Sequence, residues 1–212
     1  MMNVAAYSRR DFALSDNAIK IILSILFFCS GISALIYQLM WQRMLFTIFG
    51  VDLLSITVIV SVFMFGLGVG GIVGGIIADK LPAHLLRLYI CIELGIAVFG
   101  LVSPWLIITI GNIFFSNNEF ATMASSFIIL AIPTILMGAT FPILVKHVNV
   151  INQNIGRSVG NLYFANTLGG AFGAYLAGFV LLSSMDMTGA IDRAALLNIA
   201  IAFSAYLVFR RK

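Results

Sequence analysis

The sequence has 212 residues, of which 61% are hydrophobic and only 9% are charged, and its mean hydropathy is +1.09. Soluble domains carry about 25% charged residues, so this composition excludes a water-soluble globular protein. Since a helix needs about 20 apolar residues to cross a bilayer, the chain has room for up to about six crossings. Little chain is left for a domain outside the membrane, which weighs against an independent soluble enzyme.

Six apolar runs predict transmembrane helices, at residues 19–41, 55–78, 86–110, 121–145, 159–183 and 190–209. The runs are continuous, whereas the strands of a membrane β-barrel alternate in polarity over shorter segments. The predicted fold is therefore all-α, a polytopic membrane protein with six transmembrane helices. We expect a flexible cytosolic tail at 1–18, a six-helix transmembrane domain at 19–209 and a basic cytosolic C-terminus at 210–212.

The lysines and arginines predict the orientation of the chain. Arg43 and Arg193 fall on one side of the predicted bundle. The other ten fall on the opposite side: Arg9, Arg10, Lys20, Lys80, Arg87, Lys146, Arg157, Arg210, Arg211 and Lys212. By the positive-inside rule this second side is cytosolic, so both termini are expected in the cytosol. The net charge of +4 then reflects topology and favours contact with the lipid bilayer, with no support for nucleic-acid binding.

Glycines are concentrated in the second and fifth predicted helices, where small residues let helices approach closely. The predicted helix-packing residues are Gly66, Gly70 and Gly74 in the second helix and Gly169, Gly173 and Gly178 in the fifth. Such rows either pack inside the bundle or face a second copy or another protein. The two helices are equivalent if the chain consists of two three-helix repeats, which would be inverted in the membrane as in many secondary transporters.

Glu93 is the one acidic residue well inside a predicted helix, about seven residues or roughly 10 Å from its cytosolic end. An ionisable group at that depth is a candidate for a functional site. Polar residues at comparable depth complete a predicted substrate-binding cluster: Thr140, Asn161, Tyr163, Asn166 and Thr167. The cluster would suit a cationic or proton-coupled small substrate. The alternative is a hydrogen-bonded structural carboxyl and polar contacts between helices, and Asn198 is expected to form a hydrogen bond of that kind.

Other polar residues receive simpler interpretations. Tyr37, Gln38, Trp41 and Arg43 end the first predicted helix, where such residues usually anchor the membrane interface. The sequence contains no Ser/His/Asp arrangement, P-loop or cluster of metal ligands, so we expect no catalytic residue, metal or cofactor.

Several segments resemble the membrane region of bacterial fused spermidine-synthase-like proteins, a region similar to the major facilitators. They are Ser30 to Arg43 (SGISALIYQLMWQR), Phe63 to Lys80 (FMFGLGVGGIVGGIIADK), Arg87 to Gly95 (RLYICIELG), Met137 to Leu144 (MGATFPIL) and Gly156 to Phe179 (GRSVGNLYFANTLGGAFGAYLAGF). The stretch GIIADK, with Gly75, Asp79 and Lys80, also looks like the start of the facilitators' loop between helices two and three. The resemblance implies a bundle like half of a major facilitator, in a bacterial inner membrane.

The chain departs from that family in two ways. Gln38 stands where the family usually has Glu, and no synthase-like domain follows the sixth predicted helix, so we expect no enzyme activity. Our preferred hypothesis is a half-size transporter of a small solute, such as a polyamine or another organic cation, acting as a homodimer or with a partner. The alternative is a non-catalytic membrane anchor or subunit for a separately encoded, cytosolic spermidine-synthase-like enzyme.

Overall fold

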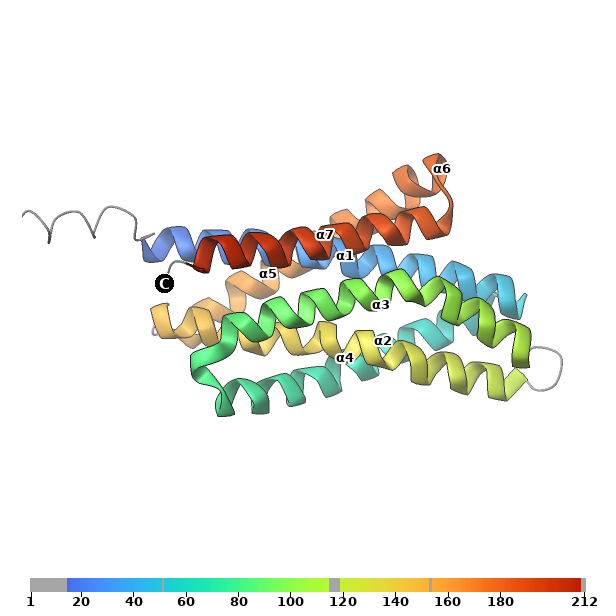
Figure 1. Ribbon diagram of the computed structural model, residues 1–212, viewed down its shortest axis with the longest axis horizontal. Helices are drawn as coiled ribbons and strands as arrows, with labels where there is room; N and C mark the ends of the chain where they lie inside the picture. The colour runs from blue at the N-terminus through green and yellow to red at the C-terminus, as the bar shows by residue number, and fades with distance from the viewer. Residues whose placement is uncertain (1–14, 51, 115–118, 153, 211–212) are drawn as a thin grey trace, which may run out of the picture.

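The computed structural model describes residues 15–50, 52–114, 119–152 and 154–210. The first four long helices are α1 (Asp16–Phe49), α2 (Asp52–Lys80), α3 (Leu85–Phe114) and α4 (Glu119–Asn152), with a short 3-10 helix, η2 (Pro82–His84), between α2 and α3. The fifth span combines α5 (Ile155–Tyr175), a π-helical segment, η3 (Leu176–Leu181), and α6 (Leu182–Ser184). The sixth is α7 (Met187–Phe209). The helices run alternately up and down (Figure 1).

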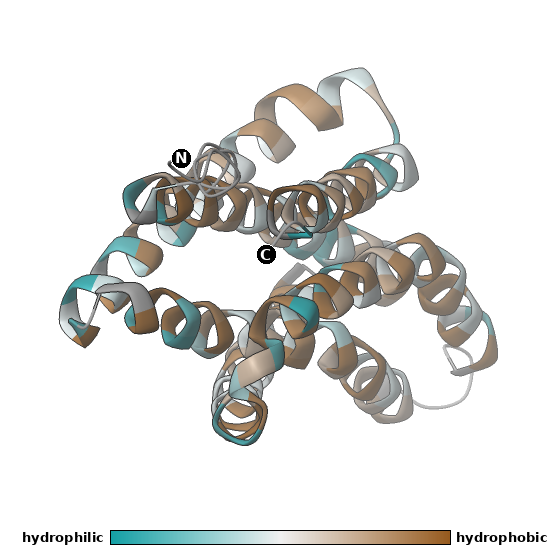
Figure 2. Ribbon diagram, turned by 60° about the vertical axis from the view of Figure 1, so that its left-hand side comes forward, coloured by the Kyte–Doolittle hydropathy of each residue, from teal (hydrophilic) through white to brown (hydrophobic). Residues whose placement is uncertain are grey.

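The expected fold class is confirmed: in the described ranges the chain is all-helical, with six helices that are long and apolar enough to cross a membrane. The six cover residues 17–49, 53–80, 82–113, 120–150, 155–184 and 187–208. Each of these helices begins before the first residue of the apolar run that predicted it. Apolar residues colour most of the length of the long helices in Figure 2, as expected for surfaces that contact lipid.

The first helix begins inside the expected tail. Ser15 caps α1, because its hydroxyl oxygen accepts a hydrogen bond from the backbone N–H of Ala18 at 3.2 Å. Helical structure therefore starts at Asp16. Residues 1–14 of the predicted tail and residues 211–212 of the predicted C-terminus lie outside the described residues.

Helix packing follows a twofold pattern along the chain. The two most extensive helix pairs are α2 with α4 and α1 with α5; α3 also packs on α4, as α1 packs on α7. The pairs α1 with α2 and α4 with α5 make smaller contacts of similar extent. If α1 is exchanged with α4, α2 with α5 and α3 with α7, each of these pairs is replaced by its counterpart: α2–α4 by α1–α5, α3–α4 by α1–α7, and α1–α2 by α4–α5. This is the packing that two inverted three-helix repeats would produce.

The glycine rows lie at the two most extensive interfaces. A β-carbon added to Gly66, Gly70 or Gly74 of α2 would collide with α4, and one added to Gly169 or Gly173 of α5 would collide with backbone atoms of α1. These five glycines therefore pack inside the bundle, by letting backbones approach closely. Gly178 lies in η3, and a β-carbon there would meet no atom within 4 Å, so it makes no such contact within the described chain.

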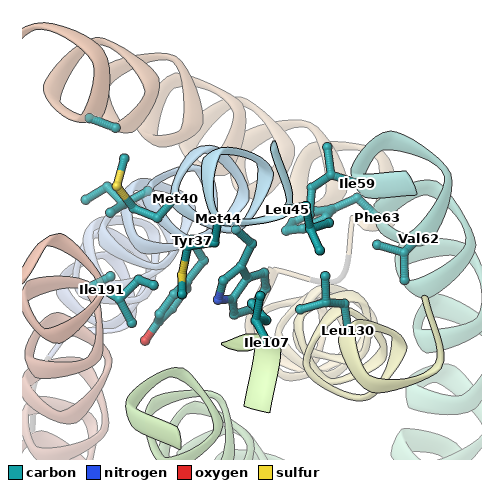
Figure 3. Packing of buried hydrophobic residues seen from close by; sticks show 14 of the residues in the cluster. Tyr37, Met40, Met44, Leu45, Ile59, Val62, Phe63, Ile107, Leu130 and Ile191 are labelled. Carbon is teal, nitrogen blue, oxygen red and sulfur yellow. The ribbon is translucent and has the colours of Figure 1, made fainter. Parts of the chain in front are cut away.

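The largest buried side chains belong to the middle of α1. Tyr37 and Trp41 are fully buried, and their rings stack with centroids 5.1 Å apart. Figure 3 shows Tyr37 among side chains of other helices, including Ile107 and Leu130. The prediction that Tyr37 and Trp41 anchor a membrane interface is wrong, because α1 continues to Phe49 and places both rings in the core.

One hydrogen bond in this core yields a stability prediction. The indole N–H of Trp41 donates to the hydroxyl of Ser103 at 2.8 Å, and that hydroxyl donates to the carbonyl of Gly100. Ser103→Ala should lower the free energy of unfolding by about 1–3 kcal/mol, because a buried donor loses its partner. Unfolding in mixed detergent micelles would measure this. Ser183→Ala is the control, since exposed Ser183 bonds only within its own helix and the expected change is below about 0.5 kcal/mol.

Candidate functional site

Glu93 lies on α3 and its side chain is 0% exposed. Its two carboxyl oxygens accept hydrogen bonds from two other helices. The Ser30 hydroxyl of α1 donates to Oε1 at 2.8 Å, and the Asn198 amide of α7 donates to Oε2 at 2.6 Å. Glu93 therefore joins α1, α3 and α7 at one point in the interior of the bundle.

Two further polar atoms, the Tyr89 hydroxyl and the Asn198 carbonyl oxygen, border this junction. The Tyr89 hydroxyl interacts with the Glu93 carboxyl but has no partner at hydrogen-bond geometry, and the Asn198 carbonyl oxygen also meets none among the described residues. Both side chains are almost completely buried. The junction thus contains more hydrogen-bonding capacity than its direct contacts use. Bridging by buried water would satisfy such groups.

The predicted substrate-binding cluster does not assemble around Glu93. Thr140 is buried but donates to the carbonyl of Met137 within α4. Asn161, Tyr163 and Thr167 of α5 are exposed, and no hydrogen bond joins them to Glu93 among the described residues. Asn161 lines two hollows beside α1, and the ring of Tyr163 meets the ring of Phe141 in α4 edge to face.

Asn166 lies where the backbones of α5 and α1 approach closely. A β-carbon added to Gly31 of α1 would collide with the carbonyl of Asn166 and come within 3.1 Å of its side-chain oxygen. Asn166 is partly buried at this close approach of α1 and α5. It therefore takes part in the packing of those two helices, and among the described residues no hydrogen bond joins it to Glu93.

Sequence reasoning identified Glu93 and expected an interhelical hydrogen bond from Asn198, which the structure contains. It missed Ser30. The available signal was the SGIS segment, where serines beside Gly31 place small polar groups at a point where helices approach closely. The junction can hold three helices together, and none of the three hollows described along α1 is lined by Glu93.

The facilitator-like loop residues lie at the end of α2. The Asp79 carboxylate forms an ion pair with Lys146 of α4. A β-carbon added to Gly75 would lie 4.0 Å from the β-carbon of Pro142 in α4. Lys80 is the last residue of α2. The ion pair of Asp79 therefore joins α2 to α4 at the interface where Gly66, Gly70 and Gly74 also pack. Both partners are partly or largely exposed, so the pair contributes modestly to stability.

A hollow of about 500 Å³ opens between α1, α2 and the end of α5. Its polar lining comes from one face of α1, through Gln38, Gln42 and Arg43. The apolar lining residues are Leu35, Leu39, Phe46, Ile56, Ile59, Val60 and Ala174. Small-molecule sites typically have volumes of about 300–1,000 Å³ with a few polar groups in an apolar wall, so this hollow has the size and composition of a binding site. We call it the amide hollow.

Comparison with known proteins gives one distant relation. No protein-family model matches the chain, and no solved structure matches it. The chain is similar to a polyamine aminopropyltransferase of Oceanobacillus iheyensis, with 24% identity over 206 residues. The alignment covers 94% of this chain but 38% of the relative, so the chain spans well under half of that protein. The similarity includes nearly all of the six-helix region, and the resemblance to the membrane region of fused synthase-like proteins stays a prediction.

Proposed function

We propose that this chain is one half of a membrane transporter for a small polar solute, completed by a second copy or a partner. The amide hollow carries the proposal. It offers hydrogen-bonding groups from Gln38 and Arg43, beside Gln42, whose amide donates to the Ser55 hydroxyl at 3.3 Å, and it lies in the size range of a small-molecule site. The relative's name, a polyamine aminopropyltransferase, makes polyamines the first solutes to test.

The exposed faces of α2 and α5 support a second subunit. Gly68 and Gly71 of α2 and Gly160 of α5 have no atom of the described chain within 4 Å of an added β-carbon. Small residues on a membrane-exposed surface favour close contact with another helix. Because the amide hollow opens between α1, α2 and α5, a subunit docked on these faces would also enclose the solute.

The test is uptake by proteoliposomes that contain the purified chain. We expect uptake of radiolabelled spermidine or putrescine, and a fall to below about a tenth of that rate in Ala174→Trp, because the indole fills the amide hollow. Ala171→Trp is the matched control: it lies one turn earlier on α5, is exposed and does not line the hollow. Wild-type vesicles that take up neither amine, or equal rates in the two variants, would contradict the proposal.

Arg43 allows the charge of the solute to be tested. Its guanidinium would repel a polyamine and attract an anion in the same hollow. If amines are the natural solutes, Arg43→Gln should raise the apparent affinity for spermidine. A fall in affinity would mean that Arg43 binds an acceptor group of the solute, and the amine assignment would then be abandoned.

A second candidate function follows from the relative alone. The chain could serve as a membrane subunit for an aminopropyltransferase, since the similarity to such an enzyme covers 94% of this chain. Affinity purification of the chain from its native membrane should then recover a protein with aminopropyltransferase activity. Purification without that activity would remove this candidate and leave the transporter proposal standing.

We also propose an inner-membrane location with both termini in the cytosol. Six described basic residues support this orientation because the alternating helices bring them to one end of the bundle (Figure 1): Lys20, Lys80, Arg87, Lys146, Arg157 and Arg210. Fusions of alkaline phosphatase to the C-terminus should be inactive, whereas fluorescent protein fusions there should fluoresce. The opposite result would reverse the topology.

A further inference from the structure

Two adjoining hollows lie between α1 and α5 near the points where both helices begin. The first has a volume of about 360 Å³ and the second about 410 Å³. They share the lining residues Lys20, Ile21 and Asn161, so together they form one continuous groove. We call this the α1–α5 groove. It is separate from the amide hollow, which lies toward the other end of α1.

The groove is polar and cationic at one end. Lys20 of α1 and Arg157 of α5 line the first hollow together with the amides of Asn17 and Asn161. Both helices begin here, α1 at Asp16 and α5 at Ile155, and helix N-termini carry partial positive charge. No carboxylate is among the described lining residues of either hollow. The side chain of Asp16, one turn before Lys20, lies outside the described part. An anionic group is the complementary ligand for this end.

The other end of the groove is apolar. Its wall consists of Ile25, Phe28, Phe164, Ala165 and Leu168, with Ser24 at the border. From Lys20 to Phe28 the helix rises about 12 Å, which is most of the roughly 15 Å depth of one leaflet of the hydrocarbon core. A ligand that fills both ends therefore has an anionic head and a long apolar tail, in the orientation of a lipid in the surrounding bilayer.

We propose that the α1–α5 groove binds one anionic phospholipid, with its phosphate between Lys20 and Arg157 and an acyl chain along Phe28 and Phe164. Basic pockets between transmembrane helices are known to suit anionic headgroups, because the cations act in a region of reduced dielectric. A free phosphate would satisfy only the cationic end and would leave the apolar wall unused. The site is independent of solute transport, so it can exist whether or not the amide hollow binds a solute.

Native mass spectrometry of the detergent-solubilised chain tests this site. The probes are dioleoyl-phosphatidylglycerol and dioleoyl-phosphatidylcholine, added at equal concentration. We expect one phosphatidylglycerol molecule to be retained in preference to phosphatidylcholine, and glycerol 3-phosphate in excess not to displace it. Equal retention of the two lipids, or displacement by glycerol 3-phosphate, would overturn the proposal.

Charge variants then locate the lipid. The double substitution K20Q/R157Q should weaken retention of phosphatidylglycerol about thirtyfold, because each basic side chain contributes roughly a fivefold factor. The matched control is K80Q/R87Q, which removes the same charge at the same end of the bundle but outside the groove (Figure 1). Its retention should stay within about threefold of wild type. A similar loss in both double variants would mean diffuse surface attraction and would refute a specific site.

Ala165→Trp tests the apolar end without changing charge. The indole would fill the second hollow and should weaken phosphatidylglycerol retention about tenfold. Ala171→Trp, on an exposed part of α5 outside the groove, should not. If K20Q/R157Q fails to fold, as judged by thermal unfolding, this pair of variants still decides the proposal. Unchanged retention in Ala165→Trp would contradict it.

Discussion

Glu93→Ala should destabilise the bundle by about 3 kcal/mol. The substitution removes both acceptors of the three-helix junction, so the Ser30 hydroxyl and the Asn198 amide lose their partners in a fully buried position. It also leaves a cavity where the carboxyl group was, which adds to the loss. Unfolding in mixed micelles, followed by circular dichroism, would give the change in the free energy of unfolding.

Glu93→Gln is the matched control for this experiment. Glutamine keeps the size of the side chain and one acceptor, and the Ser30 hydroxyl can accept a hydrogen bond as readily as it donates one. We expect a loss below about 1 kcal/mol. If alanine and glutamine have equal small effects, the junction does not hold the helices together. If glutamine leaves stability intact but abolishes uptake, the carboxyl has a role in transport beyond packing.

A double-mutant cycle would isolate the contact between α3 and α7. Asn198→Ala alone leaves one oxygen of Glu93 without its donor, whereas Glu93→Ala with Asn198→Ala removes both partners. We expect the double variant to lose less than the sum of the two single losses, with a coupling energy of about 1–2 kcal/mol. Additive losses would mean that the contact contributes nothing of its own.

Gly70→Ala should lower the free energy of unfolding by about 3 kcal/mol. A β-carbon at this position would overlap the backbone carbonyl of Ile135 and approach the α-carbon of Gly138 to 2.9 Å. Backbone atoms of a packed helix cannot turn aside as a flexible side chain can. The α2 and α4 helices would therefore have to separate, at the most extensive interface of the bundle.

Gly68→Ala is the control on the same helix. A β-carbon on Gly68 meets no atom within 4 Å, so alanine adds no clash there. Since glycine is less favourable than alanine in a helix by about 1 kcal/mol, this variant should be as stable as wild type or slightly more so. Equal destabilisation by both substitutions would show that loss of glycine, rather than the contact with α4, is responsible.

The six spans could be predicted because continuous apolar runs of this length have few other solutions. The ends of the helices could not be predicted in this way, because a helix ends where the backbone leaves the helical conformation and not where the hydropathy falls. Gly50 ends α1 in a left-handed conformation with φ of 66°, eight or nine residues after the last residue of the expected span. That extension moved Tyr37 and Trp41 from an expected interface into the core.

The candidate site was only partly accessible from sequence. Glu93 stands out because it is an acid within an apolar run, but its partners depend on which faces of the helices meet. Residues at the same depth need not share a face, and Asn161 and Tyr163 are exposed whereas Glu93 is fully buried. The amide hollow could not be predicted either, because its lining joins α1, α2 and α5.

The twofold packing pattern has a consequence for biosynthesis. Both of the most extensive pairs, α1 with α5 and α2 with α4, join an early helix to a late one. When α1, α2 and α3 have entered the membrane, the glycine face of α2 and the matching face of α1 therefore lie against lipid. The bundle closes only when α4 and α5 have been inserted, so until then these two faces contact lipid in place of their partner helices.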